Sequence, residues 1–164
     1  MQTQQTLKSR RSIRSFNSQP LSSSTIEELI DCARFAPTAR NIQPWEFVVV
    51  TKKSTLEALG AFIENGRFIS QSRCSIAIFC QDTKYYLEDG CAATQNILIA
   101  ATELGLGSCW VAGDKKEYAP KVKELLSVPE NFKLVSLIAL GYSDSPTPIV
   151  PKRSVKEVLH WEKF

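Results

Sequence analysis

Apolar residues recur every three or four positions between residues 24 and 35, and this spacing predicts an amphipathic helix over Ser24–Phe35. Ser24 and Glu27 stand three residues apart at its start, which is the pattern of a capping box with Ser24 as the N-cap. Pro37 ends the helix, because the residue before a proline is pushed out of the helical region.

Short, continuous apolar runs predict strands, and the first of them is typical of a strand buried on both faces. The runs are Phe47–Val50, Ile76–Cys80, Ser108–Val111 and Leu134–Leu140. Helical spacing predicts further helices over Leu56–Phe62, residues 86–104 and Val122–Leu126, with a short helical turn near Ser154–Leu159. Strands and helices therefore alternate along a single α+β or α/β domain of 164 residues.

Two segments of this pattern suggest contact with another subunit. The helix over residues 86–104 is apolar on two faces, which is typical of a central helix or of one shared with a partner. Pro146, Pro148 and Pro151 exclude regular structure from the start of the C-terminal tail. Such a tail is either loose or clamped on a neighbouring subunit.

Composition narrows the class of protein. Apolar residues make up 43% and charged residues 23%, which excludes a disordered chain, and the net charge of +3 is too small to indicate a nucleic-acid partner. No apolar run is long enough to span a bilayer, and the polar start of the chain lacks the apolar core of a signal peptide. We therefore expect a cytoplasmic protein without a membrane partner.

Cysteine and histidine usage restricts the chemistry. The five cysteines are scattered without a CxxC pair, which favours reduced, mostly buried thiols in a cytosol-like compartment. Because His160 is the only histidine, zinc sites and Ser–His or Cys–His catalysis are nearly excluded. Any chemistry is therefore expected to belong to a bound cofactor.

The first candidate site is the basic run Arg10-Arg11-Ser12-Ile13-Arg14. In an extended segment alternate side chains share a face, so Arg10, Ser12 and Arg14 would converge. Two guanidinium groups and a hydroxyl offer a phosphate charge-assisted donors. The alternative interpretation is a solvated basic N-terminus.

The second candidate is the loop Ala36–Trp45, between a predicted helix and a predicted strand. Its small residues allow the backbone to approach a planar ligand, and Asn41 and Gln43 supply amide groups that match the edge of a heterocycle. The alternative is a turn in which Asn41 caps backbone groups and Trp45 begins the core.

The third and fourth candidates lie later in the chain. Gly105–Gly113 lacks the spacing of a dinucleotide-binding fingerprint, but its small residues Ala112 and Gly113 could present backbone N–H groups to a ligand at a strand end. Lys152 and Arg153 follow Pro151 and could join Arg10 and Arg14 around one phosphate. The alternative for this basic pair is solvated surface.

Taken in this order, the segments resemble the FMN-dependent nitroreductase family. The matching motifs are R-R-S-x-R at Arg10–Arg14, A-P-[ST]-A-x-N-x-Q-P-W at Ala36–Trp45, G-L-G-S-C-W at Gly105–Trp110, and a proline-flanked Arg153. The resemblance implies an α+β fold, with a mixed β-sheet flanked by helices, in an intertwined homodimer. Residues 1–164 would form one FMN-binding domain whose tail, residues 142–164, is clamped on the partner.

The same resemblance implies the residues that contact FMN at two sites in the dimer interface. They are Arg10, Arg11, Ser12, Arg14, Lys152 and Arg153 at the phosphate and ribityl chain, Pro37, Thr38, Ala39, Arg40 and Asn41 from the partner at the isoalloxazine, and Trp110, Val111, Ala112 and Gly113 facing the ring. No side chain is implied as a catalytic acid or base, and no metal ligand is implied.

Two departures from longer family members affect the expected substrate. Residues 82–85 lead almost directly from the second predicted strand into the long helix. A helical lid insertion that longer members carry at this place is therefore missing. Ala112 stands where longer members often carry an acidic residue. Asn65 and Arg67 are candidates for an additional asparagine and lysine that contact flavin in those members.

The implied activity is hydride transfer from NADH or NADPH through FMN to a nitroaromatic, quinone or similar small acceptor, by a ping-pong mechanism. One alternative is a flavin-binding module without significant turnover, which would need the same contacts. Another is a homodimeric scaffold or nucleic-acid accessory protein that uses its basic N-terminus. The low net charge and the lack of a face that combines basic and aromatic residues argue against the latter.

Overall fold

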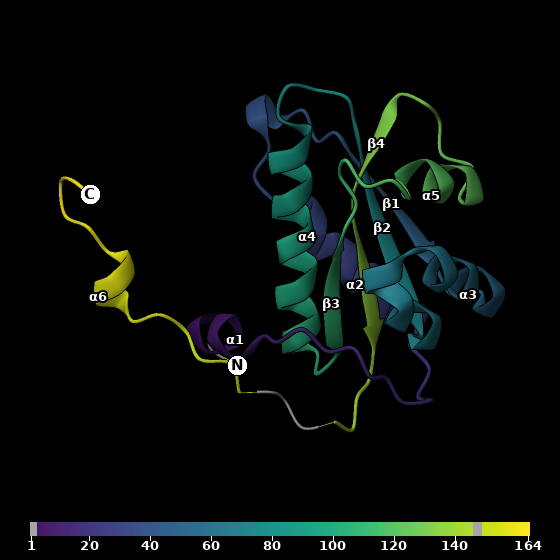
Figure 1. The fold of residues 1–164 in the computed structure, drawn as a ribbon, viewed down its shortest axis with the longest axis horizontal. Coiled ribbons are helices and arrows are strands. Elements are labelled where there is room, and N and C mark those ends of the chain that lie inside the picture. Colours follow the sequence, from purple (N-terminus) through teal and green to yellow (C-terminus); the bar gives the residue numbers. More distant parts are fainter. Residues whose placement is uncertain (1–2, 146–148) are drawn as a thin grey trace.

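A four-stranded antiparallel sheet forms the centre of the fold in the computed structural model, which describes residues 3–145 and 149–164 (Figure 1). Its strand order is β1-β2-β4-β3, so β2 and β4 are central and β1 and β3 are edges. The strands are β1 (Trp45–Val50), β2 (Cys74–Gln81), β3 (Gly107–Ala112) and β4 (Phe132–Gly141). Both central strands are buried over nearly their whole length, because helices cover both faces of the sheet.

The alternation of side chains along β2 and β4 divides the core into two clusters. On one face, Ile76 and Ile138 pack with helices α2 (Ser23–Arg34) and α4 (Tyr86–Glu103). On the opposite face, Phe79 packs against a second cluster to which three further helical segments contribute. These segments are α3 (Lys53–Phe62), the 3-10 helix η2 (Glu64–Gln71) and α5 (Ala119–Leu125).

The predicted α+β class and the order of its elements are confirmed. Strands β1 to β4 all pair antiparallel. The sheet is mixed only through one parallel bridge, between Ser12 and Ser108, among the described residues 3–145 and 149–164. The sequence gives no signal for α1 (Thr3–Ser9), because this segment is polar and only Thr6 is buried.

Two local predictions are wrong. The N-cap of α2 is Ser22, which has an extended backbone and accepts a hydrogen bond from the Thr25 N–H at 3.0 Å, so the capping box expected at Ser24 and Glu27 does not form. Strand β1 is not buried on both faces, because it is an edge strand on which Val49 is 40% exposed.

Helix α4 lies so close to the sheet that Gly90 leaves no room for a side chain. A Cβ at this position would lie 2.7 Å from Val135 Cγ2 and 3.0 Å from Cys80 Sγ. Alanine favours a helix over glycine by about 1 kcal/mol, but overpacking a core costs about 1–3 kcal/mol. We therefore expect Gly90→Ala to lower the free energy of unfolding, measured by urea denaturation, by about 1 kcal/mol, which is the difference between the middle of the overpacking range and the helix gain. An unchanged or higher stability would contradict this close packing.

The C-terminal tail leaves the body of the chain. All described residues from 149 to 164 are exposed, and Figure 1 shows this yellow segment reaching away from α4. Its short helix α6 (Val155–Val158) is stabilised locally by a capping box in which Ser154 and Glu157 bond to each other's backbone and side chain. Pro146 and Pro148 lie outside the described residues, and no helix within the described ranges is long and apolar enough to cross a membrane.

Candidate functional site

The N-terminal basic segment lies along the open edge of β3. The Ile13 N–H donates to the Ser108 carbonyl at 2.9 Å, and Ser12 forms the parallel bridge with Ser108. Strand β4 occupies the opposite edge of β3, so this segment extends the sheet by a short stretch of extended chain. The segment is therefore held in the extended conformation in which alternate side chains share a face.

Arg10, Ser12 and Arg14 all lie near enough to the Cys109 thiol to affect its pKa, which agrees with this alternation. Burial raises the pKa of Cys109, while Arg14, a hydrogen bond with Ser12 and the charge of Arg10 act in the opposite direction. The Arg14 guanidinium also lies over the Phe68 ring, 5.7 Å from its centre. Within the described residues, neither Arg10 nor Arg14 forms an ion pair with a carboxylate. This face of the segment thus offers two guanidinium groups to an anion.

Arg11 points away from this face. Its Nη1 donates to the Lys8 carbonyl at 2.7 Å and to the Arg10 carbonyl at 2.8 Å, which satisfies acceptors at the C-terminal end of α1. Neighbouring side chains of an extended segment face opposite ways, so Arg11 cannot share the face of Arg10 and Arg14. In this structure the Arg11 guanidinium therefore bonds to the end of α1 and does not lie with those of Arg10 and Arg14.

The loop before β1 is ordered by a residue that the sequence analysis missed. Asp89, in the first turn of α4, accepts a hydrogen bond from the Thr38 hydroxyl at 2.8 Å and one from the Ala39 N–H at 3.2 Å. Pro37, Arg40 and Asn41 are exposed, so this part of the loop is open to a ligand or to a second chain. The sequence offers no clear signal for this role, because Asp89 follows another acidic residue, Glu88, in the first turn of the helix.

The alternative interpretation of this loop is correct in part. Trp45 is buried, with 7% of its surface exposed, and it begins β1. The Asn41 side chain does not cap a backbone group but accepts a hydrogen bond from Gln43 Nε2 at 3.1 Å.

The loop and the basic segment lie at opposite ends of α4. Thr6 of α1 donates to Glu103 in the last turn of α4, whereas the loop contacts Asp89 in the first turn. At 1.5 Å per residue these turns are about 21 Å apart along the helix axis. Figure 1 accordingly shows α1 beside the C-terminal end of α4. A single chain therefore does not bring Pro37–Asn41 to Arg10 and Arg14.

The sequence predicts that the backbone N–H groups of Ala112 and Gly113 are free to bind a ligand at the end of β3, and the structure differs at Gly113. The Gly113 N–H donates to the Val135 carbonyl at 3.0 Å, so it is not available to a ligand, and Val111 is buried in the core. The backbone N–H and C=O groups of Ser108 face the open edge of β3. Because this direction alternates along a strand, the backbone groups of Trp110 and Ala112, two and four residues later, face the same edge. The N–H groups at the open edge are thus those of Trp110 and Ala112.

The open edge of β3 continues into a groove of about 460 Å³ beside η2. Gly66 of η2 packs against Val111, since a Cβ on Gly66 would lie 3.2 Å from Val111 Cγ1. The groove is lined by Phe62, Glu64, Asn65, Lys115, Lys116, Glu117, Tyr118 and Lys121. Tyr118 closes one side, where its hydroxyl donates to the Ala112 carbonyl. Asn65 therefore lies near the end of β3.

Lys152 and Arg153 do not join the site within one chain. Both are exposed in the tail, and Arg153 Nη2 donates to the Glu157 carbonyl four residues later, at 2.6 Å. In the described ranges, no hydrogen bond or ion pair connects Arg153 to the basic segment near the N-terminus.

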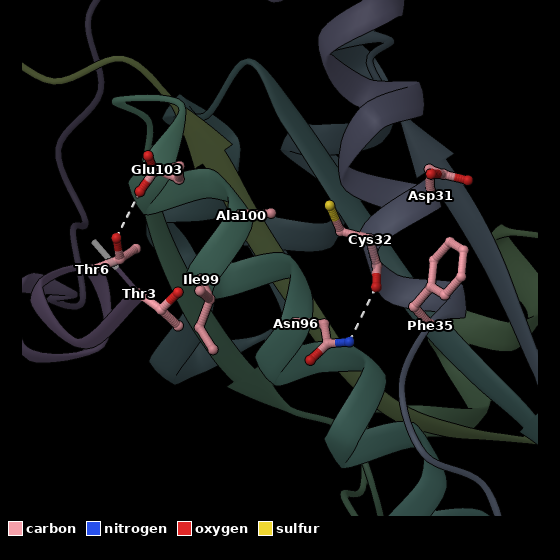
Figure 2. Close-up of a pocket in the computed structure, with 9 residues that line it drawn as sticks. All are labelled: Thr3, Thr6, Asp31, Cys32, Phe35, Asn96, Ile99, Ala100 and Glu103. Carbon is pink, nitrogen blue, oxygen red and sulfur yellow. Dashed lines mark hydrogen bonds between the residues drawn. The ribbon is translucent and has the colours of Figure 1, made fainter. Parts of the chain in front are cut away.

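The outer side of α4 carries a mostly apolar groove of about 420 Å³ (Figure 2). Figure 2 shows side chains from α1, α2 and α4 around it, with Asn96 Nδ2 donating to the Cys32 carbonyl at 3.0 Å. At one side stands Phe35, which is 70% exposed. An exposed apolar groove on a helix that is apolar on two faces is the kind of surface that a second subunit covers.

Comparison with known proteins agrees with the resemblance to the nitroreductase family. A model described as the nitroreductase family matches residues 7–78 and 80–142. A protein of Archaeoglobus fulgidus, named as a candidate NADH dehydrogenase/NAD(P)H nitroreductase, is 36% identical over an alignment of 141 positions that covers 81% of this chain and 80% of the relative. A protein of Bacillus subtilis named FMN reductase (NADPH) is 29% identical over 93% of this chain and 72% of its own length.

A solved structure agrees in fold as well as in sequence. An FMN-dependent nitroreductase from Clostridium difficile superposes with a TM-score of 0.91 at 29% identity, and the match covers 97% of this chain and 98% of that chain.

Proposed function

The chain belongs to the nitroreductase family, and we propose that it is an FMN-dependent oxidoreductase that passes a hydride from NADH or NADPH to a small acceptor. The observation that carries this proposal is the pair of guanidinium groups, Arg10 and Arg14, beside the open edge of β3, which form no ion pair with a carboxylate among the described residues. The names of the Bacillus subtilis and Clostridium difficile relatives support FMN as the cofactor.

The residues at the open edge fit the parts of FMN. Arg10, Ser12 and Arg14 would bind the phosphate, because guanidinium and hydroxyl groups are charge-assisted or neutral donors to its oxygens. The N–H groups of Trp110 and Ala112 would donate to polar atoms of the ring. When bound, FMN supplies the two-electron chemistry, accepting a hydride from NAD(P)H and passing it to the acceptor. The protein residues then bind and orient the reactants and need not act as acid or base.

The active form in this proposal is a homodimer with two FMN sites. The loop Pro37–Asn41 lies at the other end of α4 from Arg10, so it can border a flavin ring only in a second copy. In this dimer the groove on α4 and the exposed tail would be the surfaces that contact the other copy. The tail, from residue 149 to 164, presents Val155, Trp161 and Phe164 at 70%, 79% and 107% exposure, and we propose that these side chains pack on the partner.

We further propose nitroaromatics and quinones as acceptors, used by a ping-pong mechanism. Only a short link, residues 82–85, joins β2 to α4, so no inserted helix covers the site on that side. An open, flat site suits planar acceptors that occupy the position vacated by the nicotinamide. In this reaction NAD(P)H and a proton reduce a quinone to its hydroquinone by two electrons, or a nitro group to a nitroso group and water.

Steady-state kinetics on the FMN-loaded protein test this proposal. We expect NADH or NADPH oxidation that depends on added quinone or nitroaromatic, with parallel lines in double-reciprocal plots. Bound FMN without turnover would favour the alternative, a flavin-binding module for storage, sensing or assembly. A colourless protein that takes up no added FMN would contradict the proposed function itself.

A further inference from the structure

The loop between α2 and β1 has a backbone that its own residues do not favour. Arg40, Asn41 and Gln43 have φ values of 54°, 55° and 53°, in the left-handed region that residues other than glycine seldom adopt. Such a conformation persists only where the surroundings impose it. Contacts outside the loop must therefore hold it in place.

Those contacts centre on Asp89. Asp89 is buried, with 5% of its surface exposed, and its two carboxylate oxygens accept from the Thr38 hydroxyl at 2.8 Å and the Ala39 N–H at 3.2 Å. The Thr38 oxygen in turn accepts a hydrogen bond from the Gln43 N–H at 3.1 Å. The bonds thus join both ends of the left-handed stretch to one carboxylate.

Helix α4 gives this carboxylate a rigid base. Asp89 lies in the first turn of the 18-residue helix, where a negative charge interacts favourably with the helix dipole. The next residue, Gly90, packs directly on Val135 of the sheet. The loop is therefore fixed to the sheet through α4, while Arg40 and Asn41 remain exposed at its surface.

We propose that Thr38 and Asp89 are positioning residues, which hold the loop Pro37–Asn41 in the shape that completes the FMN site of the partner subunit. The proposal rests on the proposed function, because it assigns these residues to an FMN site shared by two chains. Neither side chain need touch the flavin. If the loop is released, the fraction of molecules competent to bind FMN falls, and the apparent Kd rises by the same factor.

A pair of substitutions at Thr38 isolates the hydroxyl. Thr38→Val keeps the shape and removes the bonds to Asp89 and Gln43, whereas Thr38→Ser keeps the hydroxyl. We expect Thr38→Val to raise the Kd for FMN at least about tenfold and to change the visible circular dichroism of bound FMN, and Thr38→Ser to restore most of the affinity. The matched control is Thr102→Val, which removes an α4 hydroxyl that, among the described residues, bonds to the Leu98 carbonyl of its own helix.

Mixed dimers test whether the loop acts on the partner. Chains with different affinity tags are co-expressed, one carrying Arg10→Ala with Arg14→Ala and the other carrying Thr38→Val, and the mixed dimer is isolated by both tags. If the loop serves the partner, one site combines both defects and the other is fully native. The mixed dimer then binds one FMN with the wild-type Kd.

The contrary results are equally specific. If the loop serves its own chain, each site carries one defect, and no FMN binds with the wild-type Kd. An unchanged Kd in Thr38→Val, or an equal loss in Thr102→Val, would also overturn the positioning role. A wild-type dimer that binds no FMN would instead refute the proposed function, so the two failures are distinguishable.

Discussion

Replacing Arg10 and Arg14 together with alanine is expected to weaken FMN binding by about two to four orders of magnitude. A hydrogen bond to a charged group contributes about 1.5–3 kcal/mol, and each 1.4 kcal/mol changes a dissociation constant tenfold. The charges of both guanidinium groups act on Cys109, and within the described residues no carboxylate forms an ion pair with them. Fluorescence titration of FMN into the flavin-free variant measures the effect.

Arg11→Ala provides the matched comparison, because it removes the same side chain one position away. Its guanidinium bonds to carbonyls at the end of α1 instead of facing Cys109. We expect its effect on the Kd to be at least tenfold smaller than that of either Arg10→Ala or Arg14→Ala. Equal losses at all three positions would mean that general positive charge, and not the geometry of one face, attracts the cofactor.

Deleting residues 149–164 is expected to convert the protein from a dimer to a monomer that does not retain FMN. The tail makes its described hydrogen bonds within itself and exposes its apolar side chains, and in the proposed dimer these side chains pack on the other chain. The deletion removes this packing together with Lys152 and Arg153. Light scattering after size-exclusion chromatography gives the mass, and the absorbance of bound flavin gives the retention.

Lys156→Ala is the control for the tail, because it changes an exposed charge of α6 without removing apolar surface. We expect it to remain a dimer with full FMN content. A deletion variant that stays dimeric and yellow would show that the tail is dispensable, and the groove on α4 would then account for association by itself.

The order of helices and strands could be predicted from the sequence because local pattern determines it. The apolar runs of β2 and β4 and the spacing in α2 and α4 each lie within one element. The position of β1 at the edge of the sheet could not be predicted, because it depends on which strands pair. An apolar run such as that of β1 occurs in both edge strands and central strands.

The candidate site was predictable where one segment defines it. Alternation along an extended chain places Arg10, Ser12 and Arg14 on one face whatever the fold. The Gly113 donor was predicted wrongly, because only the pairing with β4 shows that its N–H is bonded to Val135. Asp89 was missed because its partners, Thr38 and Ala39, are 50 or more residues away in the chain.

The structure of the FMN complex tests the central claim most directly. We predict a dimer with two flavins, in which the phosphate of each is bound by Arg10 and Arg14 of one chain and its ring is bordered by Pro37–Asn41 of the other. A flavin enclosed by a single chain, or a phosphate bound away from both arginines, would contradict the account.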